Sequence, residues 1–309
     1  MMKKINCTIL LCIVLIFLLA SCGKNAEATI IEINRDIQDG YVLEELDIGQ
    51  IGIGNPGGIC IYNNNIYLCD TKNNCIVKLS KDLEMLESYG TLGRESGNFS
   101  GPMDITFSGD SFYVLDNGNS RVQKFSADFE YQETYDLEYL ASRQGSGLYI
   151  SIAVDNEGII YVSTISPDTR DGYIFYWDHD TWNKLGENVI GYLCEGDGKV
   201  YFANIMEFEG KMTIQSGKNV FYEIDAGELK PICRFINSYA PAALTYWNNR
   251  IYMASAGMRS VNYFTDESEM LETVLALPDA SLHMHMCIDD DGNIYISDNG
   301  IGRFYRAVQ

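Results

Sequence analysis

An all-β, six-bladed β-propeller is the fold class that the sequence predicts, and three observations lead to it. A short pattern of an apolar residue, a tyrosine and two mostly small or apolar residues occurs six times, at spacings of 40 to 51 residues. A second strand-like run precedes each tyrosine by about eight residues, and further strand-like runs follow it. Four antiparallel strands in about 45 residues are typical of one propeller blade. The repeated tyrosines are Tyr67, Tyr113, Tyr161, Tyr201, Tyr252 and Tyr295.

The elements of a repeat follow one another in a fixed order. Tight polar turns at residues 63–65, 156–158 and 290–292 predict hairpins between the first and second strands. Residues 121–125 are typical of a third strand and residues 131–137 of a fourth. Each repeat therefore supplies a complete four-stranded antiparallel sheet, except the last.

The sixth repeat reaches only its third strand, at residues 302–308, before the sequence ends. Near the amino terminus, residues 46–52 parallel residues 87–93, the fourth strand of the first repeat. We therefore expect residues 41–48 to supply the outer strand of the sixth blade. Such a closure joins both ends of the propeller and removes an open sheet edge.

The second repeat carries the sharpest signature, and the sixth matches it in part, including Arg303. The signature consists of Gly97-Asn98-Phe99, Pro102-Met103-Asp104-Ile105, Phe112-Tyr113-Val114-Leu115-Asp116 and Asn119-Ser120-Arg121-Val122-Gln123-Lys124-Phe125. This signature resembles the NHL repeat, which implies a propeller over residues 41–309. The first repeat keeps Asp70 but has Cys75 where the family often has arginine, and repeats three to five keep little beyond the strands.

The first residues predict export and a lipid anchor. Two lysines precede an apolar stretch at residues 5–20, which at about 16 residues is short for a membrane span. The stretch ends in Leu19-Ala20-Ser21-Cys22, which resembles the bacterial lipobox; a secretory signal with a chance cysteine is the alternative. We expect a signal peptide at residues 1–21 and a lipidated Cys22 that begins a tether at 22–40. The protein would then lie on the extracytoplasmic face of a bacterial membrane, attached through the lipid alone.

The composition limits the partners. The formal net charge is −21, so the surface repels phosphate backbones, and we expect no nucleic-acid partner. We expect a monomer without a cofactor. Aligned repeats place Cys60, Cys194 and Cys287 at one position that favours a small buried side chain, and a Cys60–Cys69 disulfide stays open as an alternative. The ligand spacing of a zinc site is absent from the sequence, so no metal site is predicted.

Long loops of the third and fourth repeats are expected to gather on the face where the central channel opens, although neutral insertions would give the same pattern. The third repeat has its loop at residues 165–172, with Arg170, and the fourth at residues 205–219, with Glu207 and Phe208. The connection that contains Arg143 leads to the same face.

Residues just before each first strand should line the channel mouth: Asp104, Ser151, Tyr192, Ala243 and His285. His283 and His285 alternate at strand spacing, which would point both to one side. Asp116 with Arg121, and Asp298 with Arg303, repeat between blades and are interpreted as structural pairs that brace turns.

The leading hypothesis is a non-enzymatic binding module whose loop-rich face takes an extracellular protein or a glycan. Tyr149, Tyr192, Tyr239 and Phe208 would offer aromatic surface, and Arg94, Arg143 and Arg170 would offer positive charge. The alternative is a channel-centred lyase or hydrolase that uses His283 or His285 with Asp104, and a purely structural scaffold is a third possibility. The sequence identifies no catalytic residue.

Overall fold

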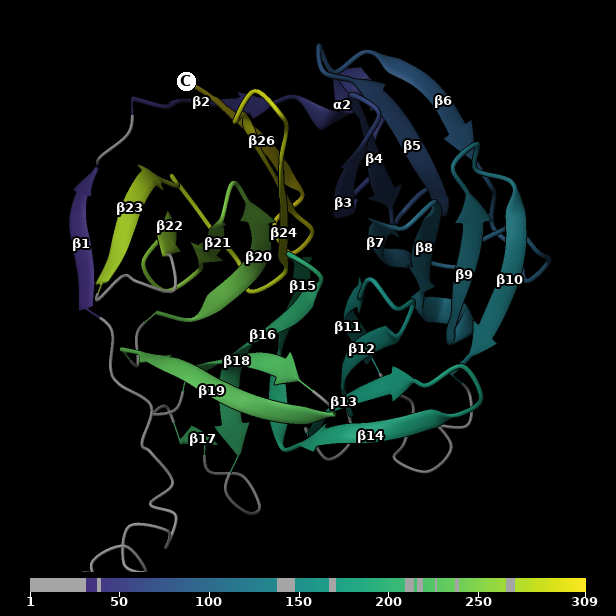
Figure 1. Ribbon diagram of the computed structural model, residues 1–309. Coiled ribbons are helices and arrows are strands. Elements are labelled where there is room, and N and C mark those ends of the chain that lie inside the picture. Colours follow the sequence, from purple (N-terminus) through teal and green to yellow (C-terminus); the bar gives the residue numbers. More distant parts are fainter. Residues whose placement is uncertain are drawn as a thin grey trace, which may run out of the picture.

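The computed structural model is a ring of six antiparallel blades around a central channel (Figure 1). It describes residues 32–37, 40–137, 148–166, 171–208, 214–215, 219–225, 227–236, 239–264 and 270–309. The predicted all-β, six-bladed propeller is confirmed. Among the described residues, no helix is long and apolar enough to cross a membrane.

The first three blades each consist of four consecutive strands, with the first strand innermost. Blade one contains β3 (Pro56–Tyr62), β4 (Asn65–Asp70), β5 (Cys75–Ser80) and β6 (Met85–Tyr89). Blade two contains β7 (Pro102–Ser108), β8 (Ser111–Asp116), β9 (Arg121–Ser126) and β10 (Tyr131–Asp136), with a short 3-10 helix η1 (Asn117–Asn119). Blade three contains β11 (Leu148–Val154), β12 (Ile160–Ile165), β13 (Gly172–Trp177) and β14 (Trp182–Glu187).

The other three blades depart from this plan by added strands or by the origin of one strand. Blade four contains β15 (Val189–Gly196), β16 (Lys199–Phe208), β18 (Asn219–Asp225) and β19 (Glu228–Phe235), and β17 (Ile214–Gln215) pairs with β16. Blade five contains β20 (Pro241–Trp247), β21 (Arg250–Ser255), β22 (Ser260–Phe264) and β23 (Met270–Ala276). Blade six contains β24 (Met284–Ile288), β25 (Ile294–Asp298), β26 (Arg303–Val308) and β2 (Val42–Leu46), which the short helix α2 (Ile48–Ile51) follows.

The repeated tyrosines lie in the second strand of each blade, where both faces of the sheet pack against neighbouring blades. All six are at most 9% exposed, so the pattern marks the apolar layers between blades. The turns before these strands use left-handed backbone: Asn63 and Asn64 have φ of 49° and 60°, as the favoured hairpin turns require. Asparagine adopts this conformation more readily than most residues, which explains these polar turns.

The predicted closure of the ring is confirmed. β2 pairs antiparallel with β26, from Val42 opposite Val308 to Leu46 opposite Phe304. Two ion pairs add to the seam: Arg306 Nη2 lies 2.6 Å from Glu44 Oε2, and Arg303 Nη1 lies 2.8 Å from Glu45 Oε2. One sheet thus holds strands from near both ends of the chain.

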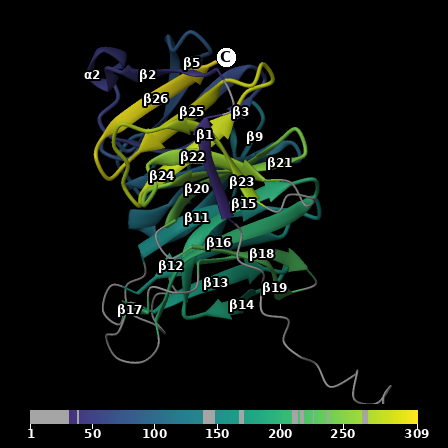
Figure 2. The same ribbon diagram turned by 90° about the vertical axis from the view of Figure 1, so that its left-hand side faces the viewer.

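The strand β1 (Glu32–Ile37) was not expected, because the sequence places these residues in a tether. β1 runs parallel to β23 as a fifth strand on the outside of blade five (Figure 2). The outer edge of β23 offers unpaired backbone groups, and side chains reinforce the pairing. Asn34 Nδ2 donates to Glu272 Oε2 at 2.9 Å, and Thr273 Oγ1 donates to the Asn34 carbonyl at 2.6 Å. These six residues therefore belong to the propeller, while the predicted signal peptide and Cys22 lie outside the described residues.

Candidate functional site

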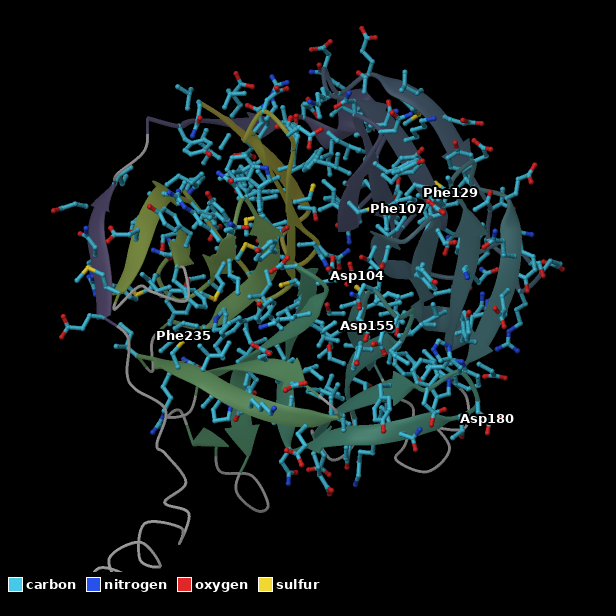
Figure 3. The ribbon with its side chains drawn as sticks, in the orientation of Figure 1. Asp104, Phe107, Phe129, Asp155, Asp180 and Phe235 are labelled. Atoms are coloured by element: carbon cyan, nitrogen blue, oxygen red, sulfur yellow. The ribbon has the colours of Figure 1, made fainter. Side chains whose placement is uncertain are left out.

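The first strands of the six blades line the central channel. Together β3, β7, β11, β15, β20 and β24 surround a cavity of about 240 Å³ on the channel axis. Asp104, labelled in Figure 3, lies close to this axis. The mouth positions predicted by aligning the repeats (Asp104, Ser151, Tyr192, Ala243 and His285) all line this cavity.

Asp104 connects blade two with blades three and six in the mouth. Its carboxylate accepts hydrogen bonds at 2.9 Å from the backbone N–H of Ile105 and from that of Ile152 in blade three. Its Oδ1 also lies 3.2 Å from Nδ1 of His285, which belongs to blade six. The two side chains are only 9% and 8% exposed. The structure therefore brings together Asp104 and His285, which the sequence had grouped as candidates.

Gly58 makes this pairing possible, because blade one lies between blades six and two. A Cβ atom at Gly58 would lie 2.7 Å from the backbone nitrogen of Ile105 and would overlap Asp104. Only glycine leaves room for His285 to reach Asp104 across blade one. Gly58 has no chemical group that marks it in the sequence, although the same repeat alignment places it at the mouth position of blade one.

Tyr192 covers a second part of the mouth, opposite Gly58. Its hydroxyl donates to the carbonyl of Leu282, so the side chain of blade four reaches past the small Ala243 of blade five. Its ring meets that of His285 edge to face, with centroids 6.1 Å apart. Burial, with a smaller contribution from the charge of Asp104, raises the pKa of Tyr192 and keeps the hydroxyl protonated.

The existing hydrogen bonds of the mouth residues limit the reactions that they could catalyse. A carboxylate on Nδ1 of His285 fixes the imidazole and leaves Nε2 for a second partner, which is the arrangement of a general base. However, Asp104 is already surrounded by three nitrogen atoms, and the hydroxyl of Tyr192 is bonded to the backbone. Within the described ranges, no three His, Cys, Asp or Glu side chains lie close enough together to hold a metal ion.

Four of the predicted aromatic or histidine side chains are placed differently from the expectation. Tyr149, Tyr192 and Tyr239 are 1%, 3% and 0% exposed, so the prediction that they offer aromatic surface is wrong. The rings of Tyr149 and Tyr239 pack between blades, where the Tyr149 hydroxyl donates to the Leu137 carbonyl and that of Tyr239 to Asn262 Oδ1. His283 is exposed and does not share a strand face with His285, because β24 begins only at Met284.

The remaining candidates lie on the mouth face or outside the described residues. Arg94 is exposed on the loop between blades one and two, and its Nε donates to Asn119 Oδ1 at 3.3 Å. Glu207 and Phe208 belong to β16, which extends into the predicted loop, and only their backbone is described. Arg143 and Arg170 lie outside the described residues.

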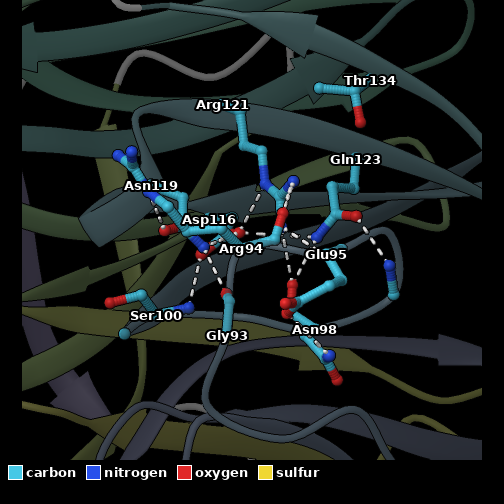
Figure 4. Close-up of polar contacts among 12 residues, drawn as sticks. Gly93, Arg94, Glu95, Asn98, Ser100, Asp116, Asn119, Arg121, Gln123 and Thr134 are labelled. Atoms are coloured by element: carbon cyan, nitrogen blue, oxygen red, sulfur yellow. Dashed lines mark hydrogen bonds and ion pairs between the residues drawn. The ribbon is translucent and has the colours of Figure 1, made fainter.

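A polar network braces the mouth-side loop of blade two (Figure 4). Asp116 accepts from Arg121 Nε and Asn119 Nδ2, both at 2.8 Å, and from the backbone N–H of Ser100 at 2.7 Å. The Arg121 guanidinium also donates to the carbonyls of Arg94, Glu95 and Asn98. The network fixes the loop at residues 93–100 to the end of β8, which is a structural role.

Residues 99–125, which contain most of this network, match the family model described as the NHL repeat. Blade two is an NHL repeat. The sixth blade departs from it: Arg303 pairs with Glu45 of β2, whereas Asp298 accepts from Ser281 and from the Gly300 N–H. The predicted brace between Asp298 and Arg303 is therefore wrong, because the closing strand offers Arg303 a nearer carboxylate.

No curated protein matches the sequence. Several solved structures, however, have a similar fold. Virginiamycin B lyase from Staphylococcus aureus is similar at 14% identity and a TM-score of 0.56, over 87% of this chain and 99% of that chain. Luciferin-regenerating enzyme is similar at 12% identity and a TM-score of 0.62, over 87% and 96%. A calcium-binding protein, regucalcin, from Agrobacterium tumefaciens is similar at 12% identity and a TM-score of 0.57, over 82% and 90%. At these identities the likeness shows the fold alone.

The six cysteines of the propeller are free thiols in the described part of the chain. Cys60 lies opposite Tyr67 in the hairpin of blade one, so it is out of register with Cys69, and the open alternative of a disulfide between them is not realised. Burial raises the pKa of Cys69, Cys194 and Cys287, which keeps these thiols protonated and unreactive.

Proposed function

We propose that the protein is a non-enzymatic binding module that is anchored by a lipid on Cys22 at the extracytoplasmic face of a bacterial membrane. Its ligand, an extracellular protein or a glycan, would contact the face where the channel opens. The observation that carries this proposal is the bonding at the mouth. Asp104, His285 and Tyr192 are at most 7% exposed and are bonded to one another or to backbone of other blades. Their bonds serve the ring and leave recognition to the surrounding loops.

Exposed side chains on that face support a role in binding. Leu92, on the loop between blades one and two, is 70% exposed, and Arg94 on the same loop is also exposed. The loop itself is held by the Asp116–Arg121 network, so both side chains project from a fixed backbone. A rigid loop with apolar and cationic groups loses little conformational entropy when it binds a partner.

The test is an interaction screen with the soluble protein from residue 24 onward against arrayed extracellular proteins and glycans. For each bound ligand, the dissociation constant is compared between the native protein, an Arg94→Ala and Leu92→Ala variant, and an Asp110→Ala control on the opposite face. We expect the double variant to weaken binding at least about tenfold and the control to leave it unchanged. Equal affinities in all three proteins would contradict the proposed face.

The anchor has its own test, which does not depend on the ligand. The full-length protein should partition into the detergent phase when it is expressed in bacteria, and a Cys22→Ser variant should move to the aqueous phase. A Cys12→Ser variant serves as a control, because this cysteine lies within the predicted signal peptide. Equal partition of all three proteins would argue against lipidation.

A channel-centred hydrolase or lyase is the second candidate, favoured by one observation: the 3.2 Å contact between Asp104 and Nδ1 of His285. Two of the similar structures are described as a streptogramin B lyase and a putative gluconolactonase. We would therefore incubate the protein with a streptogramin B antibiotic and with gluconolactone. Turnover that is lost in a His285→Gln variant and kept in a His283→Gln variant would replace the binding module by an enzyme.

A further inference from the structure

A groove lies between blades three and four on the face opposite the channel mouth. Its volume is about 780 Å³, within the range of roughly 300–1,000 Å³ that is typical of ligand pockets. The turn after β11 and the ends of β12 and β13 form one wall. The turn between β15 and β16 and the turn between β18 and β19 form the other. Because the groove is on the far face, it is separate from the surface used in the proposed function.

An aromatic side chain forms part of the first wall. Tyr176 packs beside Tyr161, with ring centroids 6.2 Å apart and planes inclined by 30°. Tyr161 is buried, and its hydroxyl donates to Asp155 Oδ2 at 3.1 Å, whereas Tyr176 is only half-buried. Part of the Tyr176 ring is therefore accessible to a ligand, and the buried Tyr161 beside it holds the ring in place.

A ring at this position distinguishes blade three from several other blades. Residue 176 lies opposite the repeated tyrosine of its blade, and the equivalent residues are Lys78, Lys124 and Arg306 in blades one, two and six. Blade five has Tyr263 there, but the guanidinium of Arg250 lies 4.2 Å above its ring. Tyr263 thus provides a matched comparison for Tyr176.

The polar groups of the groove include both hydrogen-bond donors and acceptors. The side-chain amide of Asn156 lies against Gly198, where a Cβ atom would come within 2.8 Å of its nitrogen. Lys199 Nζ lies 3.1 Å from Glu223 Oε2 across the second wall, and Glu157 is exposed on the first. Hydroxyl groups both donate and accept, so this mixed set suits a ligand that is rich in hydroxyls.

The charges in the groove argue against an ionic ligand. Four lining carboxylates, those of Asp155, Glu157, Glu223 and Asp225, would repel an anion. The cationic alternative is weakened because lysines of the chain already pair with two of these carboxylates, Lys199 with Glu223 and Lys230 with Asp225. A neutral ligand is not repelled by the carboxylates and does not compete with the lysines for them.

We propose that this groove binds a neutral oligosaccharide. One sugar ring stacks on Tyr176, and its hydroxyls bond to Asn156, Glu157 and the Lys199–Glu223 pair. A concave polar groove with one aromatic platform fits such a chain better than it fits the flat apolar surface of a protein partner.

The experiment is an array of neutral oligosaccharides, with a lysine-rich peptide and an acidic oligosaccharide as charged comparators, probed with the soluble protein from residue 24 onward. Calorimetric titration of the bound sugar then compares Tyr176→Ala, Tyr176→Phe and the control Tyr263→Ala. We expect an affinity loss of about tenfold or more for Tyr176→Ala, and little change for the other two. Asn156→Ala, on an exposed turn, supplies a second variant in case Tyr176→Ala does not fold.

The outcomes separate this site from the mouth face. Binding of a neutral sugar that Tyr176→Ala or Asn156→Ala weakens, and that Arg94→Ala leaves unchanged, supports the proposal. Absence of any neutral sugar ligand overturns it, as does a sugar that binds equally well to both groove variants. Binding of the lysine-rich peptide alone, lost at high salt, would assign the groove to a cationic partner instead.

Discussion

Replacing Asp104 by alanine should destabilise the propeller more than any ordinary surface change. The substitution removes the acceptor of the Ile105 and Ile152 N–H groups and the partner of His285 Nδ1, in a place where the side chain is 9% exposed. A hydrogen bond to a charged group contributes roughly 1.5–3 kcal/mol, and losses that share one acceptor are not additive. We therefore expect a loss of about 4 kcal/mol in the free energy of unfolding, which corresponds to roughly 8–16 °C in melting temperature for a domain of this size.

Urea denaturation followed by tryptophan fluorescence measures this loss. Asp110→Ala, at an exposed turn of the same blade, is the control and should change the unfolding free energy by less than about 0.5 kcal/mol. His285→Gln removes only one of the three contacts, so we expect a smaller loss than for Asp104→Ala. If the unfolding free energy of Asp104→Ala lies within about 1 kcal/mol of that of the native protein, the carboxylate does not hold the blades together.

Three further predictions address other positions. Gly58→Ala should lower the melting temperature, because its Cβ would overlap Asp104 and Ile105. Gly109→Ala is the control and should lower it less, because its Cβ meets open space, although its φ is positive. Equal melting temperatures of the two variants in calorimetry would contradict the close approach of Asp104 to blade one. Burial, followed by the charges of Asp155 and Asp197, raises the pKa of Glu195, so its ionisation lowers stability as pH rises above about 4.5. Glu195→Gln should therefore stabilise the protein more at pH 7 than at pH 4, and melting curves at both values check the sign. Finally, the five buried cysteines should react with a thiol reagent only after denaturation, and rapid native labelling of all of them would show that the blades open.

The sequence predicts the propeller well because its signal is repeated and its strands pair locally. Six tyrosines at similar spacings identify the blades, and the likeness of residues 46–52 to residues 87–93 identifies the closing strand. β1 could not be predicted in this way, because Glu32–Ile37 is mostly exposed and polar and matches no repeat. It becomes a strand through the edge of β23, more than 230 residues away, and only the folded ring provides that edge.

The site is less predictable, because the alignment of repeats gives the level of a residue in the channel but not its partner. Asp104 and His285 were placed correctly at the mouth, yet their contact depends on the missing side chain of Gly58. Tyr149 lies at the start of β11 and Tyr239 just before β20, where blade connections suggest surface, but both rings pack between blades and their hydroxyls bond there. Whether an aromatic side chain near a loop points inward depends on the space between two blades, and the alignment of the repeats does not predict that space.

The mouth can be understood as a solution to a problem that every propeller has. The inner strand of each blade has no strand partner on its channel side, so some of its backbone N–H groups need other acceptors. Asp104 supplies one for Ile152 in blade three, and Ser151 in turn supplies one for Leu193 in blade four, at 3.2 Å. The polar residues that look most like a catalytic centre are thus explained in large part by the closure of the ring. Recognition is then better sought where side chains leave the ring, on the braced loop of Arg94 and in the groove beside Tyr176.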